Sequence, residues 1–368
     1  MAGEAPRGDR RTAPRVGELI PNADPLEQAL ELAREGRAAE KRRALPEALL
    51  AYERARDLAA QLEPTPLLAN VLRWMGSVHR DIGDPVRADE CYLESLRVAE
   101  ITGTTSGQAA ALNCRAVIVQ RRGDLDEAVA LYRRAARLAA EAGEIRLAGM
   151  IEQNLGVLAN IRGDLDGALV RYRASLRAFQ QVRDDEAVSW VLNNMGMLLN
   201  DLGKPERAEA SFLQGLEIAR TRGDRAMEGT LLSNYAEGLL AARRWTAAEN
   251  ALERALTIAR EGGEPARAAE ALKFRGVLER ERGDRARAAR HLEEALVIAR
   301  SVDDPLLVAE VLRESGELRL RGGDRAGALA DLTEALSGFE RLAATLDAER
   351  TRARIAALAA TGPEETAT

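Results

Sequence analysis

The sequence predicts an all-α fold, a solenoid of eight helix-turn-helix repeats followed by a C-terminal capping helix. Hydrophobic residues make up 46% of the chain but aromatic residues only 3%, so strong helix formers such as Ala and Leu dominate its apolar part. A Gly-Asp turn recurs every 40 residues, and residues of fixed size recur in phase with it. Such units stack, because one helical pair cannot bury its apolar face alone.

The residues before the first repeat are expected to form a disordered tail. Residues 1–24 contain Pro, Gly and Arg but few apolar groups. The Arg10–Arg11 pair has no apolar run after it, so it does not indicate an export signal. No uninterrupted apolar stretch approaches the roughly 18 residues of a membrane-spanning helix. We therefore expect a cytoplasmic protein that makes no membrane contact.

The repeats span residues 25–344, and each first helix is predicted to end at the recurring turn. A left-handed residue there, usually Gly, would terminate the helix. The turn positions are Arg43, Gly83, Gly123, Gly163, Gly203, Arg243, Gly283 and Gly323. Most second helices are predicted to begin after an aspartate, which is a good N-cap. These aspartates are Asp84, Asp124, Asp164, Asp284 and Asp324.

Columns of small and bulky residues predict close packing of the two helices in each repeat. One column is alanine throughout: Ala48, Ala88, Ala128, Ala168, Ala208, Ala248, Ala288 and Ala328. Another is mostly glycine: Gly36, Gly76, Ala116, Gly156, Gly196, Ala236, Gly276 and Gly316. Glycine inside a helix costs about 1 kcal/mol relative to alanine. Helix axes only about 8–10 Å apart would offset that cost, with a Tyr, Phe or Leu ring or side chain lying over the small residue.

A last helix over residues 345–361 is predicted to cap the stack. Leu346, Ile355 and Leu358 give it an apolar side, and charged residues cover the rest. Such a cap is needed because a terminal repeat otherwise exposes its core. Gly362-Pro363 would end the helix, and we expect residues 362–368 to be disordered.

These columns resemble the tetratricopeptide repeat. The family pattern stands out in Gly156…Ala168…Tyr172…Ser175 and in Gly196…Ala208…Phe212…Gly215. The repeat length of 40 rather than roughly 34 residues is similar to the longer variety of kinesin light chains and Pins/LGN scaffolds. The resemblance covers residues 25–344. It implies a right-handed solenoid whose first helices line a concave groove, and a non-enzymatic scaffold.

The chain offers little material for catalysis, metals or nucleic acid. His79 and His291 lack a catalytic partner at an obvious spacing, and Cys91 and Cys114 lack metal-ligand spacing. Neither phosphate-binding nor hydrolase motifs occur, so we expect no enzyme, no metal and no cofactor. Similar bacterial proteins that dephosphorylate response regulators need an additional N-terminal helical bundle, for which repeats beginning near residue 25 leave no room. The net charge of −6 opposes general nucleic-acid binding.

By the resemblance, partner-binding residues lie on the first helices and face the groove. Asparagine occupies one column in three consecutive repeats, as Asn154, Asn194 and Asn234. Asparagine competes with helix hydrogen bonds, so its recurrence suggests a role outside the helix, such as pairing with the backbone of an extended peptide. Further candidates are Asn113, Asn193, Asn160, Asn200, Met150, Trp190 and Trp74, with Met197 beside them.

Two interpretations of the asparagines stay open: they bind a peptide, or they hydrogen-bond to neighbouring helices and stiffen the stack. A two-cation clamp for a terminal carboxylate is not evident, because Lys273 and Arg313 stand among Glu270, Glu310, Glu314 and Glu317. The sequence predicts a monomeric adaptor that binds a peptide or helical segment of a partner protein. Two alternatives are a ligand-sensing subunit, such as a bacterial regulator of signalling or transcription, and a module that self-associates through its terminal repeats.

Overall fold

The computed structural model describes residues 24–342 and 344–360, and every regular element in that part of the chain is an α-helix. The two expected tails fall outside the described residues, apart from Asp24. Contacts divide the chain into two compact units between Leu158 and Ala159. Unit 1 holds α1 (Pro25–Lys41), α2 (Leu45–Ala59), α3 (Pro66–Asp81), α4 (Pro85–Ile101), α5 (Thr105–Arg121), α6 (Leu125–Glu141) and most of α7 (Ile145–Ile161).

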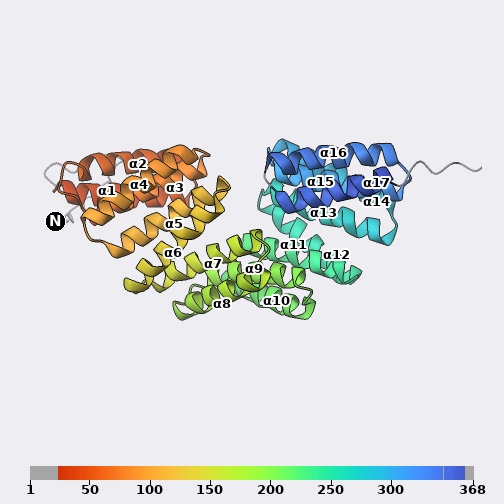
Figure 1. Cartoon of the computed structure of the whole chain (residues 1–368), viewed down its shortest axis with the longest axis horizontal. Helices are drawn as coiled ribbons and strands as arrows, with labels where there is room; N and C mark the ends of the chain where they lie inside the picture. Colours follow the sequence, from red (N-terminus) through yellow and green to blue (C-terminus); the bar gives the residue numbers. More distant parts are fainter. Residues whose placement is uncertain (1–23, 343, 361–368) are drawn as a thin grey trace, which may run out of the picture. The chain divides into compact units, whose positions relative to one another are not determined.

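Unit 2 continues the same succession of helices to the end of the described chain (Figure 1). Its helices are α8 (Leu165–Gln181), α9 (Asp185–Asp201), α10 (Pro205–Arg222), α11 (Arg225–Ala241), α12 (Trp245–Glu261), α13 (Pro265–Arg282), α14 (Arg285–Ser301), α15 (Pro305–Arg321), α16 (Arg325–Arg341) and α17 (Thr345–Ala360). Consecutive helices pack as pairs. The predicted fold class, an all-α solenoid of helix pairs, is confirmed.

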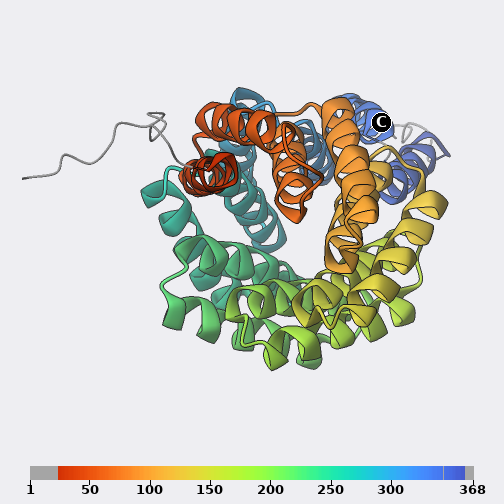
Figure 2. The same ribbon diagram turned by 90° about the vertical axis from the view of Figure 1, so that its left-hand side faces the viewer.

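Within each unit the first helices of successive repeats form one layer. Helices α1, α3 and α5 pack on one another in unit 1, as do α9, α11, α13 and α15 in unit 2. The second helices instead pack mainly on the helices next to them in sequence; Figure 2 shows the same helices in a second view. Helices that lie closer together form the inner side of a curved stack, so the first helices make up the inner layer of each unit.

The turn between the two helices of a repeat needs a left-handed residue, as predicted. All six turn glycines have positive φ, for example 86° at Gly83 and 66° at Gly203. Arg43 and Arg243 take the same conformation, with φ of 62° and 56°. The turn geometry therefore holds where a side chain disfavours it, because the packing of the flanking helices fixes it.

Most of the predicted N-caps are confirmed. The side chains of Asp84, Asp164, Asp284 and Asp324 each accept a hydrogen bond from the backbone N–H three residues later, at 2.9–3.0 Å. Asp124 is the exception, because its side chain makes no capping hydrogen bond and the prediction for this residue is wrong. Its backbone still accepts the first helical bond from Ala128, so α6 begins without help from the carboxylate.

The small columns hold the paired helices together as predicted. Each alanine of the invariant column is at most 1% exposed. A Cβ atom placed on Gly76 would lie 2.6 Å from Tyr92 Cε1, and one on Gly196 would lie 2.6 Å from Phe212 Cε1. The aromatic ring thus rests directly on the glycine backbone, which explains why these positions stay small.

One buried histidine is expected to make stability depend on pH. His79 on α3 is 5% exposed, and its Nδ1 has no hydrogen-bond partner among the described residues. Burial lowers the pKa of this imidazole, so the unfolded chain takes up the proton first. The stability that the neutral, buried imidazole of His79 contributes is therefore fully present above the unfolded pKa of about 6.5, and it is lost as the pH falls below that value.

We expect the loss to reach up to about 1.4 kcal/mol per pH unit once the unfolded imidazole is protonated. Urea unfolding between about pH 7.5 and 5 would measure it, with His79→Gln as the reference that lacks the titrating group. The difference between the two profiles isolates His79, since His291 is present in both proteins. Parallel profiles would show that His79 is solvated or paired in the folded chain.

Candidate functional site

The inner layer of both units carries hydrogen-bonded pairs of asparagines. In unit 1, Asn154 Nδ2 on α7 donates to Asn113 Oδ1 on α5, at 3.0 Å. In unit 2, Asn234 Nδ2 on α11 donates to Asn193 Oδ1 on α9, at 2.9 Å. Asn113, Asn193 and Asn234 are at most 9% exposed. These contacts are those of the second interpretation above, in which amides link neighbouring first helices.

A different set of predicted residues faces solvent on α9. Trp190 and Met197 are 40% and 42% exposed, and Asn194, which lies between them, is half-buried. The spacing of four and three residues places all three side chains on one side of the helix. Asn194 makes no side-chain hydrogen bond to any described residue, so its amide can donate and accept. We call Trp190, Asn194 and Met197 the α9 stripe.

Unit 1 contains an open pocket of about 420 Å³ between α3, α5 and α7. Two of the predicted residues, Asn113 and Met150, line it. The remaining lining includes Asn70, Arg73, Gly107 and Ala110. The small residues of α5 create the space, while the guanidinium and the amides give it polar walls. We call it the unit 1 pocket.

Cys114 also lines the unit 1 pocket. Burial raises the pKa of its thiol, so the thiol stays protonated at neutral pH and is a poor nucleophile. Arg73 Nη2 donates to Asn70 Oδ1 at 3.1 Å, and its guanidinium lies 5.7 Å from the Trp74 ring centroid. The pocket therefore offers hydrogen-bond donors and a positive charge rather than a reactive group.

Trp74, Asn160 and Asn200 neither line the unit 1 pocket nor belong to the α9 stripe. The Trp74 ring stacks on Tyr52 with 5.9 Å between centroids, and the Arg37 guanidinium covers it at 5.4 Å. Asn200 lines a smaller cavity of about 190 Å³ in unit 2. Asn160 is half-buried near the end of α7, with no side-chain hydrogen bond to a described residue. Trp74 is thus chiefly a packing residue at the N-terminal end of unit 1.

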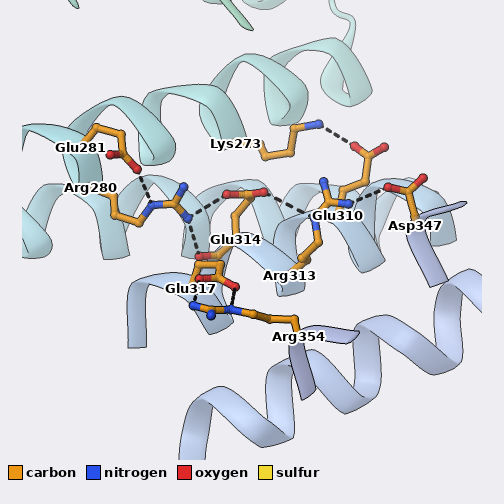
Figure 3. Close-up of polar contacts among 9 residues, drawn as sticks. All are labelled: Lys273, Arg280, Glu281, Glu310, Arg313, Glu314, Glu317, Asp347 and Arg354. Atoms are coloured by element: carbon orange, nitrogen blue, oxygen red, sulfur yellow. Dashed lines mark hydrogen bonds and ion pairs between the residues drawn. The ribbon is translucent and has the colours of Figure 1, made fainter. Parts of the chain in front are cut away.

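The C-terminal part of the inner layer in unit 2 is crossed by ion pairs (Figure 3). Lys273 Nζ on α13 lies 2.5 Å from Glu310 Oε2 on α15. The same helices are joined by Arg280–Glu314 at 2.8 Å, and Arg313–Asp347 joins α15 to α17 at 2.6 Å. Lys273 and Arg313, which the sequence analysis did not assign to a carboxylate clamp, thus pair with carboxylates of the chain itself.

Lys273 is charged in spite of its burial. Its side chain is 9% exposed. Burial acts to lower the pKa of the ammonium group, but Glu310 and Glu270 outweigh that effect and raise the pKa. Burial also raises the pKa of Glu270 and of Glu237. The charge of Lys273 is therefore balanced by several carboxylates of the same cluster.

Neither a metal centre nor a membrane span emerges from residues 24–342 and 344–360. No three His, Cys, Asp or Glu side chains in those ranges are grouped so that they could hold a metal ion. Nor does any helix there combine the length and the apolar character needed to cross a bilayer.

Comparison with known proteins decides the family. A tetratricopeptide repeat model matches residues 146–221 and 227–301, and a second model of the same repeat matches residues 108–142. The chain belongs to the tetratricopeptide repeat family. Together the matches cover just over half of its residues. The narrower likeness to kinesin light chains stays a prediction from repeat length. No curated protein matches the sequence.

Solved structures of repeat proteins share this fold. A signal transduction ATPase from Pyrococcus horikoshii with a tetratricopeptide repeat sensor is similar over 88% of this chain and 50% of its own, with 16% identity and a TM-score of 0.63. A Rap protein complexed with competence and sporulation factor is similar over 90% of this chain and 98% of its own, with 13% identity and a TM-score of 0.60. The Rap conjugation gene regulator of plasmid pLS20, in complex with the Phr* peptide, is similar over 80% of this chain and 81% of its own, with 16% identity and a TM-score of 0.57.

Proposed function

We propose that this tetratricopeptide repeat protein is a non-enzymatic adaptor that binds a peptide or helical segment of a partner protein on its inner layer. The α9 stripe carries this proposal, because it sets two exposed apolar side chains beside an amide with no partner of its own. The proposal includes a cytoplasmic monomer that binds neither nucleic acid nor membrane, in keeping with a net charge of −6.

The chemistry of the stripe suits a peptide. Tryptophan contributes a large contact area with little conformational freedom to lose, and methionine adapts its shape to a partner's side chain. The Asn194 carboxamide matches one backbone N–H and one backbone C=O of an extended segment. A purely structural stripe would bury Trp190 and Met197, since solvent exposure of both gives no packing benefit.

The structural neighbours give the proposal independent support. Two of them hold a bound factor or peptide, namely the Rap protein with competence and sporulation factor and the conjugation regulator with the Phr* peptide. At 13% and 16% identity they share the fold alone with this chain. They nevertheless give examples of this fold with a bound peptide or factor.

Replacing Trp190 with Ala is expected to weaken peptide binding at least about tenfold, because aromatic anchors at the centre of an interface dominate its energy. Asn194→Ala should weaken binding by about two- to tenfold, the value of one hydrogen bond. The peptides would be selected from a random-peptide display library on the immobilised full chain and then measured in solution by fluorescence anisotropy.

Trp245→Ala is the matched control. Trp245 is half-buried at the start of α12, a second helix, and so lies outside the inner layer. This variant should bind the selected peptides with unchanged affinity. Equal affinity of the Trp190 and Asn194 variants and the parent protein would exclude the α9 stripe as the binding surface, and a library that yields no binding peptide would contradict the proposed function.

A further inference from the structure

Buried cations on the inner layer of unit 2 are neutralised within the chain. Lys273 is 7% exposed, and its ammonium group pairs with Glu310, which stands 37 residues later on the next first helix. Glu270, one turn before Lys273 on the same helix, adds a second negative charge that raises the pKa of the lysine. Lys273 therefore lies where two carboxylates converge.

Arg73 occupies the same column five repeats earlier, but both carboxylates are missing there. The 40-residue period places Asn70 where Glu270 stands and Ala110 where Glu310 stands. Arg73 accordingly donates to Asn70 Oδ1 and, among the described residues, has no carboxylate within ion-pairing distance. The volume that a glutamate side chain would fill beside Ala110 belongs instead to the unit 1 pocket.

Two contacts fix the position of the Arg73 guanidinium in the unit 1 pocket. The Trp74 ring lies beneath it, 5.7 Å from the centroid, and the hydrogen bond to Asn70 limits its rotation. Asn113 Nδ2 has no partner among the described residues, since that side chain uses its oxygen to accept from Asn154. A planar guanidinium matches a carboxylate with two parallel hydrogen bonds, and the amide adds a third donor. The lining also carries one further charge of each sign, Arg146 and Glu144.

We propose that the unit 1 pocket binds an aspartate or glutamate side chain of the partner peptide, with Arg73 as its counter-charge. The partner's carboxylate would pair with Arg73 as the Glu310 carboxylate pairs with Lys273. This inference rests on the proposed function, because the ligand is a side chain of the same class of peptide. It adds a requirement that the α9 stripe does not impose: the partner segment is acidic at one position.

The test is a display selection in which the parent protein is the immobilised bait and excess soluble Arg73→Glu protein competes. Library peptides are fused at their C-termini and carry no free C-terminal carboxylate, so any enriched acid is a side chain. We expect the recovered peptides to share an Asp or Glu at one aligned position. Synthetic peptides of these sequences, amidated at the C-terminus, should bind Arg73→Glu at least about tenfold more weakly than the parent.

Two further variants keep the result interpretable. Arg133→Glu makes the same change of charge at an exposed site on α6, and its affinity should stay within about twofold of the parent at physiological salt because distant charges are screened. Arg73→Met keeps a long side chain beside Trp74 and removes the charge, so it replaces Arg73→Glu if that protein unfolds. It should also weaken binding about tenfold.

The outcomes separate this inference from the proposed function. Peptides that depend on Trp190 but contain no preferred acid, or that bind both Arg73 variants as the parent does, would overturn the acidic-side-chain site and leave the adaptor function standing. Replacing the aligned Asp or Glu by Asn or Gln should reproduce the loss seen with Arg73→Met. Unchanged affinity after that replacement would equally overturn the site. A selection without competitor that yields no peptide would remove both proposals together.

Discussion

Replacing Lys273 with Met is expected to lower the free energy of unfolding by about 3 kcal/mol. The change deletes the buried ammonium group that lies 2.5 Å from Glu310, so the carboxylates of Glu310 and Glu270 lose their counter-charge. Breaking a buried pair from one side costs about 3–5 kcal/mol, and we expect the lower end because the Glu310 side chain is 26% exposed. Urea unfolding followed by circular dichroism at about pH 7 would measure the loss.

The pH dependence of the same variant tests the cause. Glu270 has a raised pKa in the folded chain, and removal of the lysine raises it further. A carboxyl group with a raised folded pKa destabilises the fold above its unfolded pKa and ceases to do so as the pH falls and it takes up a proton. The deficit of Lys273→Met should therefore shrink between about pH 7 and pH 5.

The double variant Lys273→Met, Glu310→Gln supplies the matched control. With one carboxylate removed as well, it should recover part of the loss, because fewer buried charges remain unpaired. A deficit that is the same at both pH values, and that the second change does not relieve, would show that lost packing of the lysine stem is responsible and not the charge.

The turns show how much of the fold the sequence could predict. Phase alone assigned Arg43 and Arg243 to turn positions, and both adopt the left-handed conformation of the glycines in the other repeats. A period of 40 residues carries this information because every repeat reports on the same geometry. Asp124 shows the limit, since its residue type favours a cap that the structure does not form. Capping depends on one rotamer, which a repeat pattern does not specify.

The candidate site was harder to predict, because a column says that a residue recurs but not what it contacts. Asn154 and Asn234 have partners in the preceding repeat, 41 residues earlier, in Asn113 and Asn193. That paired spacing was visible in the sequence and is the signal that could have identified the hydrogen bonds. It could not show which side chains stay exposed, because exposure depends on the curvature of the inner layer.

The importance of Arg73 follows from residues that are absent from its surroundings. Sequence reasoning looks for charges at useful positions, and Arg73 is one arginine among many in this chain. Only comparison with Lys273, whose Glu310 partner sits on the next first helix, shows that Ala110 leaves a carboxylate missing. The Lys273–Glu310 pair had to be seen in the structure before the missing carboxylate beside Arg73 could be recognised.

Replacing Asn193 with Ala is expected to destabilise the chain by about 1–3 kcal/mol, because the Asn234 amide then stays buried without a partner. Asn234→Ala should cost less, because Asn193 Nδ2 keeps its contact with Met197 Sδ at 3.7 Å. The two side chains are 4% and 9% exposed, and their hydrogen bond measures 2.9 Å. Ala is the better helix former by a few tenths of a kcal/mol, which is too little to offset that penalty. Asn194→Ala, next to Asn193 but without a hydrogen bond to lose, serves as the control and should leave stability nearly unchanged.

The double variant Asn193→Ala, Asn234→Ala separates the hydrogen bond from other effects. Once both amides are gone, no buried polar group is left unpaired, so the double change should cost less than the sum of the two single changes. Urea unfolding of the four proteins gives the coupling energy directly. Affinity for a selected peptide should change little in Asn234→Ala, which is the cleaner variant because Asn193 also contacts Met197 of the α9 stripe. If instead both single variants were as stable as the parent and lost the peptide, the amides would face the partner rather than each other, and the pair between α9 and α11 would have to open when the peptide binds.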